Sequence, residues 1–482
     1  MSKLKKEVKE DFVNKVDIPL SFDASKLEDN EPIKKKFNKK WLFAIVPSAT
    51  VLVLILGIGG VAVASMLQVK TSIRLTRKQY SAEETAVIES NTFKRLNSFE
   101  YPSLTGDRYQ ALDSSSVSSF NSFANKIYQS LSYEDNASFS PVNLFSLLSV
   151  ISMGTSSTSL TSAFDSLFDG MNENKRTSLY GKIINNNTYL NSYGTSILHN
   201  GAFVDYNLGF SNPYLQKLTN NYFEAFSLNY KSDNDIGKMI DWVNDSMQEE
   251  GFLKKDDLKI NGDEILYLFS TFIFSNQWQS KYYESDNTTD YFHLDNGEQV
   301  QTTFMSHSYR GEYYDYAKYV SVYDYYQNAN SVQYIIPKSV DDNIYDILGD
   351  SSFLEESGTL NESVVVNMTA PIFTSNSLVD FKPSLESLGL GSLFSSDENN
   401  LNEMFASSPV NSYIKQIKQK NEVSFTIDGT KIKSLAIAGG ASSAAPAKGT
   451  LEVKLNQPFI YVIRDSTNIP LYIGHFDNPA VS

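Results

Sequence analysis

Apolar and polar residues recur along the chain with two periods, and these predict which segments are helices and which are strands. After the polar cluster 113–116, apolar residues recur at spacings of three and four, which predicts a helix with one face on a core. This face holds Phe120, Phe123, Ile127 and Leu131. Segments 144–153 and 236–247 are also helical in pattern, whereas 364–368 and 451–455 are strand-like. With no repeat of fixed period, the pattern predicts an α+β fold in one domain.

The longest apolar stretch, residues 41–69, contains no charged residue. As a helix it is long enough to cross a hydrocarbon core of roughly 30 Å. A buried core helix is rarely so long and uncharged. A cleaved signal peptide with the small residues 62–64 as its cleavage site is another alternative, but the preceding segment 1–40 is too long for its N-terminal region. The stretch therefore predicts an uncleaved transmembrane helix that anchors the chain in a lipid bilayer.

Positive charge is densest just before this stretch, and it predicts the orientation of the chain. Five lysines lie within 34–40, against four more widely spaced basic residues within 70–78. The positive-inside rule keeps the denser cluster in the cytoplasm. The predicted organisation is a cytoplasmic basic tail at 1–40, a transmembrane helix at 41–69, an extracellular stalk at 70–112 with at most one short helix, and a folded extracellular domain at 113–482.

Composition and charge exclude several classes of function. Cysteine is absent, which excludes disulfides, thiolate catalysis, zinc ribbons and iron–sulfur clusters. The aromatic share of 13% excludes disorder for most of the chain. After residue 80 the chain carries 26 Lys and Arg against 48 Asp and Glu. Because so acidic a body repels phosphate backbones, the sequence predicts no nucleic-acid partner.

The sequence offers no catalytic or metal-binding constellation. The four histidines, none of which has a metal-ligand spacing, are His199, His293, His307 and His475. Each is better explained as a histidine satisfied by its neighbours. Neither a nucleophile elbow nor a phosphate-binding loop occurs, and the one glycine-rich run, 57–60, lies inside the predicted anchor. The prediction is a protein that is not an enzyme and needs neither metal nor cofactor.

Eight segments resemble, in order and spacing, the motifs of the serpins, a family of serine protease inhibitors. The resemblance covers residues 115–479. Frequent Asn, Ser, Lys and Tyr suggest a bacterial source, and together with the predicted anchor at 41–69 this indicates a membrane-anchored member of bacterial type. The segments are NASFSPVNLFSLLSVISMG at 136–154, LFSTFIFSNQW at 268–278, YIIP at 334–337, VNMTAP at 366–371, LESLGL at 385–390, FTIDGT at 425–430, NQPFIYVI at 456–463 and IGHFDNP at 473–479.

The resemblance implies a fold and a mechanism. The fold has helices packed around a large central mixed β-sheet, smaller sheets and an exposed reactive loop, and here one transmembrane helix precedes it. A target protease cleaves the loop, which then inserts as an extra strand into the large sheet and distorts the trapped acyl-enzyme. An extracellular serine protease is the implied partner, and the inhibitor is expected to be a monomer.

Four positions match the places in a serpin where the large sheet opens. Trp278 corresponds to the breach, at the top of the sheet. Counting without gaps places Asn143, Ser270 and Gln419 in the shutter, under the centre of the sheet, where serpins usually have Ser, Asn and His. Two amides and a hydroxyl can satisfy one another's hydrogen bonds. Three unconnected polar residues are the alternative, and the sequence leaves both open.

The resemblance places the hinge, the first part of the reactive loop to insert, just after Asp428. Its residues are Gly429, Thr430, Ile432, Ser434 and Ala436. All but the glycine share one face of an extended strand, and the lysines at 431 and 433 share the other, which permits insertion and is equally typical of an edge strand. Efficient inhibitors have small residues where this chain has Ile432, and overpacking there costs about 1–3 kcal/mol. Slow insertion would make the protein a substrate.

The family's usual spacing places the bond that the protease cleaves at Ser443–Ala444, among small residues. Elastase-like or subtilisin-like proteases accept such residues. The alternative bond is Lys448–Gly449, which implies a trypsin-like target. Composition alone favours a flexible Gly/Ala/Ser linker for this stretch.

Two functions follow from these observations. The first is an extracellular, membrane-tethered inhibitor that traps serine proteases. The alternative is a non-inhibitory serpin fold that binds or shields at the cell surface.

Overall fold

The computed structural model describes most of the chain after residue 91, within one compact unit, Val63–Ser482. The predicted tail, the predicted anchor and residues 433–448 of the reactive loop lie outside the described residues. Within the described part, no helix is long and apolar enough to cross a membrane. The described residues are 92–105, 109–131, 136–338, 344, 347, 352–355, 358–396, 400–407, 409, 411–432 and 449–480.

A large mixed sheet, here called the first sheet, brings together segments that are far apart in the sequence. Its neighbouring strands are antiparallel except for one parallel pair, β4 with β5. In the order in which they pair, the strands are β1 (Lys94–Arg95), β5 (Phe223–Leu228), β4 (Gly194–Asp205), β6 (Leu266–Gln277), β14 (Gly429–Ile432), β13 (Lys418–Thr426) and β12 (Phe373–Asp380), with β3 (Tyr189–Asn191) paired to β4.

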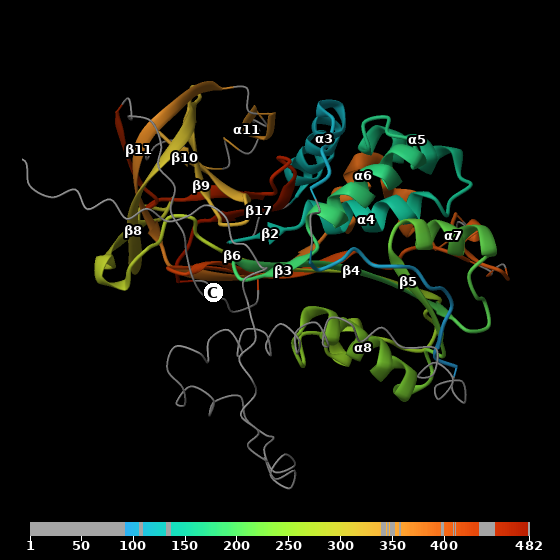
Figure 1. Ribbon diagram of the computed structural model, residues 1–482. Helices are drawn as coiled ribbons and strands as arrows, with labels where there is room; N and C mark the ends of the chain where they lie inside the picture. Colours follow the sequence, from blue (N-terminus) through green and yellow to red (C-terminus); the bar gives the residue numbers. More distant parts are fainter. Residues whose placement is uncertain are drawn as a thin grey trace, which may run out of the picture. The chain divides into compact units, whose positions relative to one another are not determined.

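Helices cover both faces of the first sheet. Figure 1 shows α3, α4, α5 and α6 on one side of the sheet and α8 on the other. Because of this cover, β5 is buried at every position and β4 at nearly every position, so neither strand alternates between buried and exposed residues. The helices are α3 (Ser114–Ser130), α4 (Pro141–Ser152), α5 (Thr158–Leu167), α6 (Glu173–Asn186), α7 (Asn212–Asn220), α8 (Asp233–Met247), α9 (Lys255–Leu258), α11 (Ser352–Glu355) and α12 (Lys382–Leu385).

Helix α4 lies directly under the centre of the first sheet. The side chain of Ser140 caps its first turn, and Pro141 occupies the first helical position, where a missing backbone N–H costs nothing. Most of its side chains are apolar, and all but two of its residues are buried. A helix of that composition belongs in a core, and α4 contacts both β6 and β17 (Pro470–Phe476).

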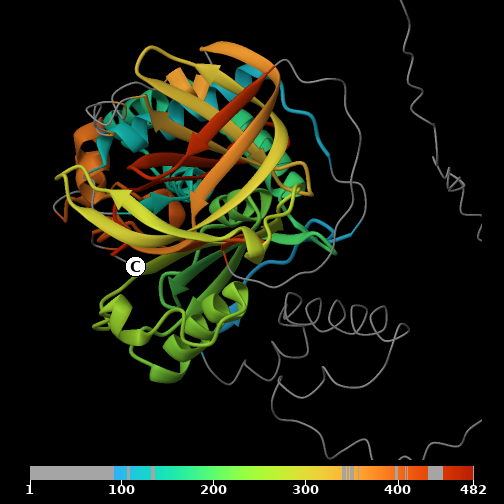
Figure 2. The ribbon, with the colours of Figure 1, turned by 90° about the vertical axis from the view of Figure 1, so that its left-hand side faces the viewer.

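The second sheet packs beside the first and shares one continuous apolar core with it. Figure 2 shows its yellow to red strands together, away from the yellow-green helix α8. One neighbouring pair, β15 with β11, is parallel. In pairing order the strands are β15 (Thr450–Lys454), β11 (Thr359–Pro371), β8 (Gln299–Asp315), β9 (Tyr319–Tyr325), β10 (Ser331–Pro337), β16 (Phe459–Arg464), β17 and β2 (Ser138–Phe139), with β7 (Thr288–His293) paired to β8.

The helices and strands predicted from apolar spacing are confirmed. The predicted helix after residue 113 is α3, capped by the Asp113 side chain. Segments 144–153 and 236–247 match α4 and α8, except that α4 ends one residue earlier, at Ser152. Segment 364–368 lies inside the longer strand β11, and segment 451–455 matches β15 to within one residue. The fold class is therefore α+β, with two mixed sheets.

Residues 92–105, here called the N-terminal segment, pack along the edge of the first sheet. Strand β1 pairs with β5, and the Leu96 N–H donates to the carbonyl of Ala225 (2.7 Å). Phe93 is buried in an apolar cluster with Phe203 of β4 and Trp242 of α8. These residues fall within the predicted stalk, where the sequence suggested at most a short helix, and in the structure they hold a strand.

Candidate functional site

Strand β14, the first four residues of the predicted hinge region, lies in the middle of the first sheet between β6 and β13. It is antiparallel to both. Thr430 is opposite Asn276 of β6 and Phe425 of β13, and Lys431 is opposite Ser275 and Ser424. Thr430 is buried, whereas Lys431 is half-buried. The start of the predicted reactive loop is thus already a sheet strand in this structure.

The chain enters β14 through a tight turn at 427–428, and the turn depends on glycine. Gly429 has φ of 152°, and a Cβ built on it would lie 2.0 Å from the carbonyl oxygen of Asn276 on β6. Any larger residue would therefore push β14 away from β6. The Thr426 hydroxyl, on the other side of the turn, donates to the carbonyl of Gly429 (3.1 Å).

Beyond β14, the facing edges of β6 and β13 have no ladder partner among the described residues. In the described part β6 pairs with β4 and β14, and β13 pairs with β12 and β14. The edges left over are 266–273 of β6 and 418–422 of β13, here called the unpaired edges. Backbone N–H and C=O groups along such edges form a template for another strand. The chain direction of β14 leads between them.

The three predicted shutter residues lie together at the N-terminus of α4, beneath the unpaired edges. The Asn143 amide donates to the backbone carbonyl of Ser270 (3.0 Å). The side chain of Gln419 accepts from the Ser140 N–H (2.7 Å) and donates to its carbonyl (3.3 Å). The Ser270 hydroxyl lies 3.2 Å from that of Ser146. These contacts do not join the three predicted side chains directly; α4 links them, and in doing so bridges β6 to β13.

A second bridge crosses the same edges on the opposite face of the sheet. The chain that follows α8 reaches β13, where the Lys420 ammonium donates to the carbonyl of Phe252 (3.0 Å) and lies 5.0 Å from its ring centre. Because α8 itself packs on β6, the two strands are held at their present separation from both faces. A strand that entered between them would have to break or stretch these contacts.

At the top of the sheet, Trp278 holds the hinge turn in place. Its indole N–H donates to the carbonyl of Thr426 (2.8 Å), and its ring stacks on that of Tyr326 at 4.7 Å. The Tyr326 hydroxyl forms a 2.6 Å hydrogen bond to the hydroxyl of Thr430. Burial raises the pKa of Tyr326 well above its usual value of 10, so its hydroxyl keeps its proton.

Sequence reasoning missed Tyr326, which is the residue that touches the hinge side chain. It lies at the end of β9, just ahead of the segment 334–337 that carries a family resemblance. An aromatic residue before a turn is a weak signal in a chain with 29 tyrosines. The bridge that pairs Trp278 with Tyr326 joins positions 48 apart in the sequence and has no local signature.

Most of the remaining residues of the predicted loop lie outside the described residues. Only the backbone of Ile432 is described, and Ser434, Ala436, Ser443, Ala444 and Lys448 lie outside the described residues. Gly449 is exposed, and its carbonyl accepts from the N–H of Val365 (2.9 Å), where β15 begins. The described part of the loop therefore stops in the first sheet at residue 432 and resumes at residue 449, beside the second sheet.

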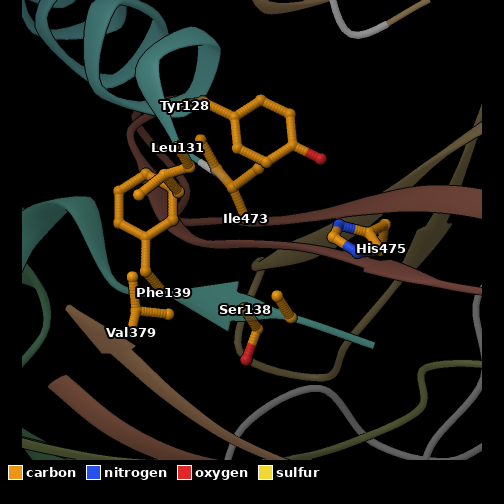
Figure 3. Close-up of a pocket in the computed structure, with 8 residues that line it drawn as sticks. Tyr128, Leu131, Ser138, Phe139, Val379, Ile473 and His475 are labelled. Atoms are coloured by element: carbon orange, nitrogen blue, oxygen red, sulfur yellow. The ribbon is translucent and has the colours of Figure 1, made fainter. Parts of the chain in front are cut away.

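A small cavity near β2 does not provide a binding site. It is bordered by side chains of α3, β2, β12 and β17 (Figure 3) and has room for about one water molecule. Nor does the described part contain a group of three or more His, Asp or Glu residues that could hold a metal ion. The lining residues are Tyr128, Leu131, Ala137, Ser138, Phe139, Val379, Ile473 and His475.

Comparisons with known proteins agree with this geometry. The family model described as "Serpin (serine protease inhibitor)" matches residues 118–479. "Alpha-1-antitrypsin-like protein GS55-MS" of Ictidomys tridecemlineatus is 28% identical over 74% of this chain and 87% of its own length. "Serpin-Z7" of Hordeum vulgare is 29% identical over 59% of this chain and 73% of its own length.

Solved structures share the fold. The native state of the thermophilic serpin Tengpin superposes with a TM-score of 0.66 at 19% identity, over 79% of this chain and 97% of that protein. AtSerpin1 of Arabidopsis, in a conformation described as native and stressed, gives a TM-score of 0.64 at 20% identity, over 77% of this chain and 100% of that protein.

Proposed function

This chain belongs to the serpin family, and we propose that it is an extracellular, membrane-tethered inhibitor that traps serine proteases by reactive-loop cleavage and strand insertion. Family membership places it among protease inhibitors and not among enzymes. The chemistry of cleavage belongs to the target protease. The inhibitor contributes a loop to be cut and a place in its sheet that the cut loop can enter.

The observation that carries this proposal is the position of β14 at the head of the unpaired edges. If residues 433–440 continue β14 in the same register, they run opposite 273–266 of β6. Lys433 then faces Glu422 of β13, and opposite charges across two strands favour pairing. Ala436 comes to lie between Ser270 and Gln419, at the shutter, where a small side chain is needed.

The register gives each hinge position a role. Ile432, Ser434 and Ala436 fall on the inner face, and the lysines at 431 and 433 on the outer face, where Lys431 is already half-buried. Insertion would pair the N–H and C=O groups along both unpaired edges. It would also separate the two ends of the cleaved bond, so a protease still joined to the loop would be carried away from its starting position.

The location and the target are part of the same proposal. The uncharged stretch 41–69 and the lysines before it support a single-pass protein anchored in the bilayer, with a cytoplasmic N-terminus and an extracellular serpin domain, as in a membrane-anchored member of bacterial type. Small residues on both sides of Ser443–Ala444 support an elastase-like or subtilisin-like target, and Lys448–Gly449 would suit a trypsin-like one.

The test is to incubate the full-length chain, in detergent, with proteases of these three specificities. We expect a covalent complex that survives denaturing electrophoresis, together with release of a peptide that begins at residue 444. Cleavage without any complex, by every protease, would contradict trapping and favour the non-inhibitory binding or shielding function.

A matched pair of variants separates trapping from cleavage. Ala436→Glu places a charge on the inner face at the shutter, so cleavage should continue while the complex disappears, because burial of an unpaired charge costs several kcal/mol. Leu435→Glu places the same charge on the outer face, opposite Lys420, and should leave complex formation intact. Equal effects of the two substitutions would argue against the register.

A further inference from the structure

A buried histidine–aspartate pair lies behind Trp278, away from the hinge itself. The side chains of His307 on β8 and Asp324 on β9 are 3% and 1% exposed, and Nε2 of the histidine is 3.0 Å from Oδ2 of the aspartate. The spacing of His307 in the sequence indicated only a histidine satisfied by its neighbours. Neither residue touches β14.

The hydrogen bonds of His307 show which protonation state the structure accommodates. Its Nδ1 lies 3.1 Å from the carbonyl oxygen of Ser280, and its Nε2 faces the Asp324 carboxylate. Carbonyl and carboxylate oxygens are acceptors, so each ring nitrogen needs a hydrogen to donate. Only the doubly protonated, positively charged imidazolium supplies both. A neutral ring would point a lone pair at one of the two oxygens.

The remaining contacts of the pair come from neutral groups. Asp324 accepts from the Tyr282 hydroxyl (3.1 Å) and from the backbone N–H of Tyr325 (2.8 Å). The ring of Tyr309 lies 4.8 Å from His307. Burial raises the pKa of Tyr282 and of Tyr309 well above 10, so both stay neutral at ordinary pH.

Further ionisable groups lie around Asp324. Tyr326 and Tyr334 lie within its electrostatic reach, and burial raises the pKa of both. The carboxylate of Glu312 contacts the hydroxyl of Tyr325, the residue after Asp324 (3.2 Å).

A continuous stack of rings connects His307 to the hinge. The His307 ring stacks on Tyr282 with centres 3.7 Å apart, and Tyr282 packs against Trp278 at 5.5 Å. Trp278 stacks on Tyr326, which bonds Thr430. Trp278 also holds the carbonyl of Thr426 at the hinge turn. The His307–Asp324 pair thus fixes the position of Tyr282. Through the ring stack, Tyr282 sets the positions of Trp278 and Tyr326, the two side chains that hold β14.

We propose that His307 and Asp324 are positioning residues for the hinge, and that loss of the His307 proton as the pH rises loosens the ring stack and releases β14 from the sheet. The docking of β14 can be measured without any protease. The consequence of β14 release for protease inhibition rests on the trapping function proposed above. A protein of this kind would hold its loop start in the sheet while His307 is protonated and free it once that proton is lost.

Hydrogen exchange with mass analysis, on the full-length chain in detergent, tests this directly. The exchange of Gly429–Ile432 is followed from about pH 5 to about pH 9, after correction for the pH dependence of chemical exchange. We expect the protection of β14 to fall about tenfold or more through the titration of one proton. The protection of β4 in the same molecules should stay constant and serves as the internal reference.

Variants assign the titrating group. His307→Gln and Asp324→Asn should each give low protection of β14 that no longer changes with pH. His293→Gln, on the half-buried β7 position, should keep the wild-type profile. A wild-type protein whose β14 protection does not change with pH overturns the proposal, whatever the variants do. So does a His307→Gln variant that retains the wild-type profile. Failure to trap any protease would leave these outcomes unaffected and would count against the proposed function alone.

Discussion

A buried carboxylate on β5 shows, at the scale of single residues, how the N-terminal segment is tied to the first sheet. Glu224 accepts from the indole N–H of Trp242 (2.7 Å) and forms an ion pair with Arg95 of β1 (3.3 Å). The two charged side chains are only 9% and 10% exposed. Burial raises the pKa of Glu224 above its ordinary 4.5, and the charge of Arg95 opposes that rise.

We predict that Arg95→Ala destabilises the protein by about 3 kcal/mol near neutral pH, since it leaves a buried carboxylate without a partner. With its folded-state pKa raised further, Glu224 binds more protons in the folded than in the unfolded protein above pH 4.5. Stability is then lost as the pH rises through that window and regained as it falls towards 4.5. Urea denaturation of the full-length chain at several pH values measures this.

The controls for this prediction lie next to the pair. The double variant Arg95→Ala with Glu224→Gln should recover most of the loss, because no charge is then buried, and the amide oxygen can still accept from Trp242. Lys94→Ala, at an exposed neighbouring position, should change stability little. A pH-independent loss in Arg95→Ala would contradict the assigned role of Glu224.

Single residues also show where sequence reasoning reaches its limit. Resemblance to a family could nominate Asn143, Ser270 and Gln419, and the structure places all three at one end of α4. It could not show that Asn143 and Gln419 bind backbone groups of Ser270 and Ser140, because a backbone group is the same whichever residue carries it. Nor could it find the His307–Asp324 pair, whose members face one another only after β8 and β9 pair.

At the scale of elements, the difference between predicted and unpredicted parts has a physical cause. Helices α3, α4 and α8 bury one face or most of their surface, so the spacing of their apolar residues predicts them. Strands β1 and β14 are only two and four residues long. They exist because long-range pairing supplies partners on β5, β6 and β13. That information is spread over the chain and is not present in their own composition.

We predict that Gly429→Ala undocks β14 and leaves the rest of the sheet folded. The added Cβ would collide with backbone atoms of Asn276 and with the Cα of Gln277, which cannot move aside as a flexible side chain could. Releasing the four residues of β14 from the sheet requires less free energy than separating β6 from β4, because β14 forms far fewer ladder pairs with β6 than β4 does. Hydrogen exchange should show protection lost at Gly429–Ile432 and retained at β4, with a thermal midpoint within a few degrees of wild type.

Gly449→Ala is the matched control for this substitution. Gly449 lies at the other end of the same loop, and a Cβ added there meets nothing within 4 Å. Its protection pattern should equal that of the wild type. If both alanine variants protect β14 equally well, the close approach of Gly429 to β6 does not govern docking.

For the whole molecule, the unpaired edges offer a place for a further strand in the first sheet. Residues 266–273 and 418–422 carry backbone groups without ladder partners in the described part, and α4 and the Phe252–Lys420 contact hold the two strands at a fixed separation. A cleaved loop is freed from its tether to β15. It can then supply those partners, at the cost of ordering its own residues.

We predict that a single cut at Ser443–Ala444 makes the protein more resistant to unfolding, although cleavage ordinarily loosens a fold. Insertion of residues 433–440 would satisfy both unpaired edges and join the two halves of the sheet, so the thermal midpoint of the cleaved chain should rise by several degrees. Differential scanning calorimetry before and after cleavage measures the shift. Ala436→Glu, cut at the same bond, should show no rise, because the charge stops insertion at the shutter. A cleaved wild-type chain that melts at or below the temperature of the intact one would mean that the edges of β6 and β13 do not accept the loop. Trapping would then lose its driving force, even if the fold and the family assignment stand.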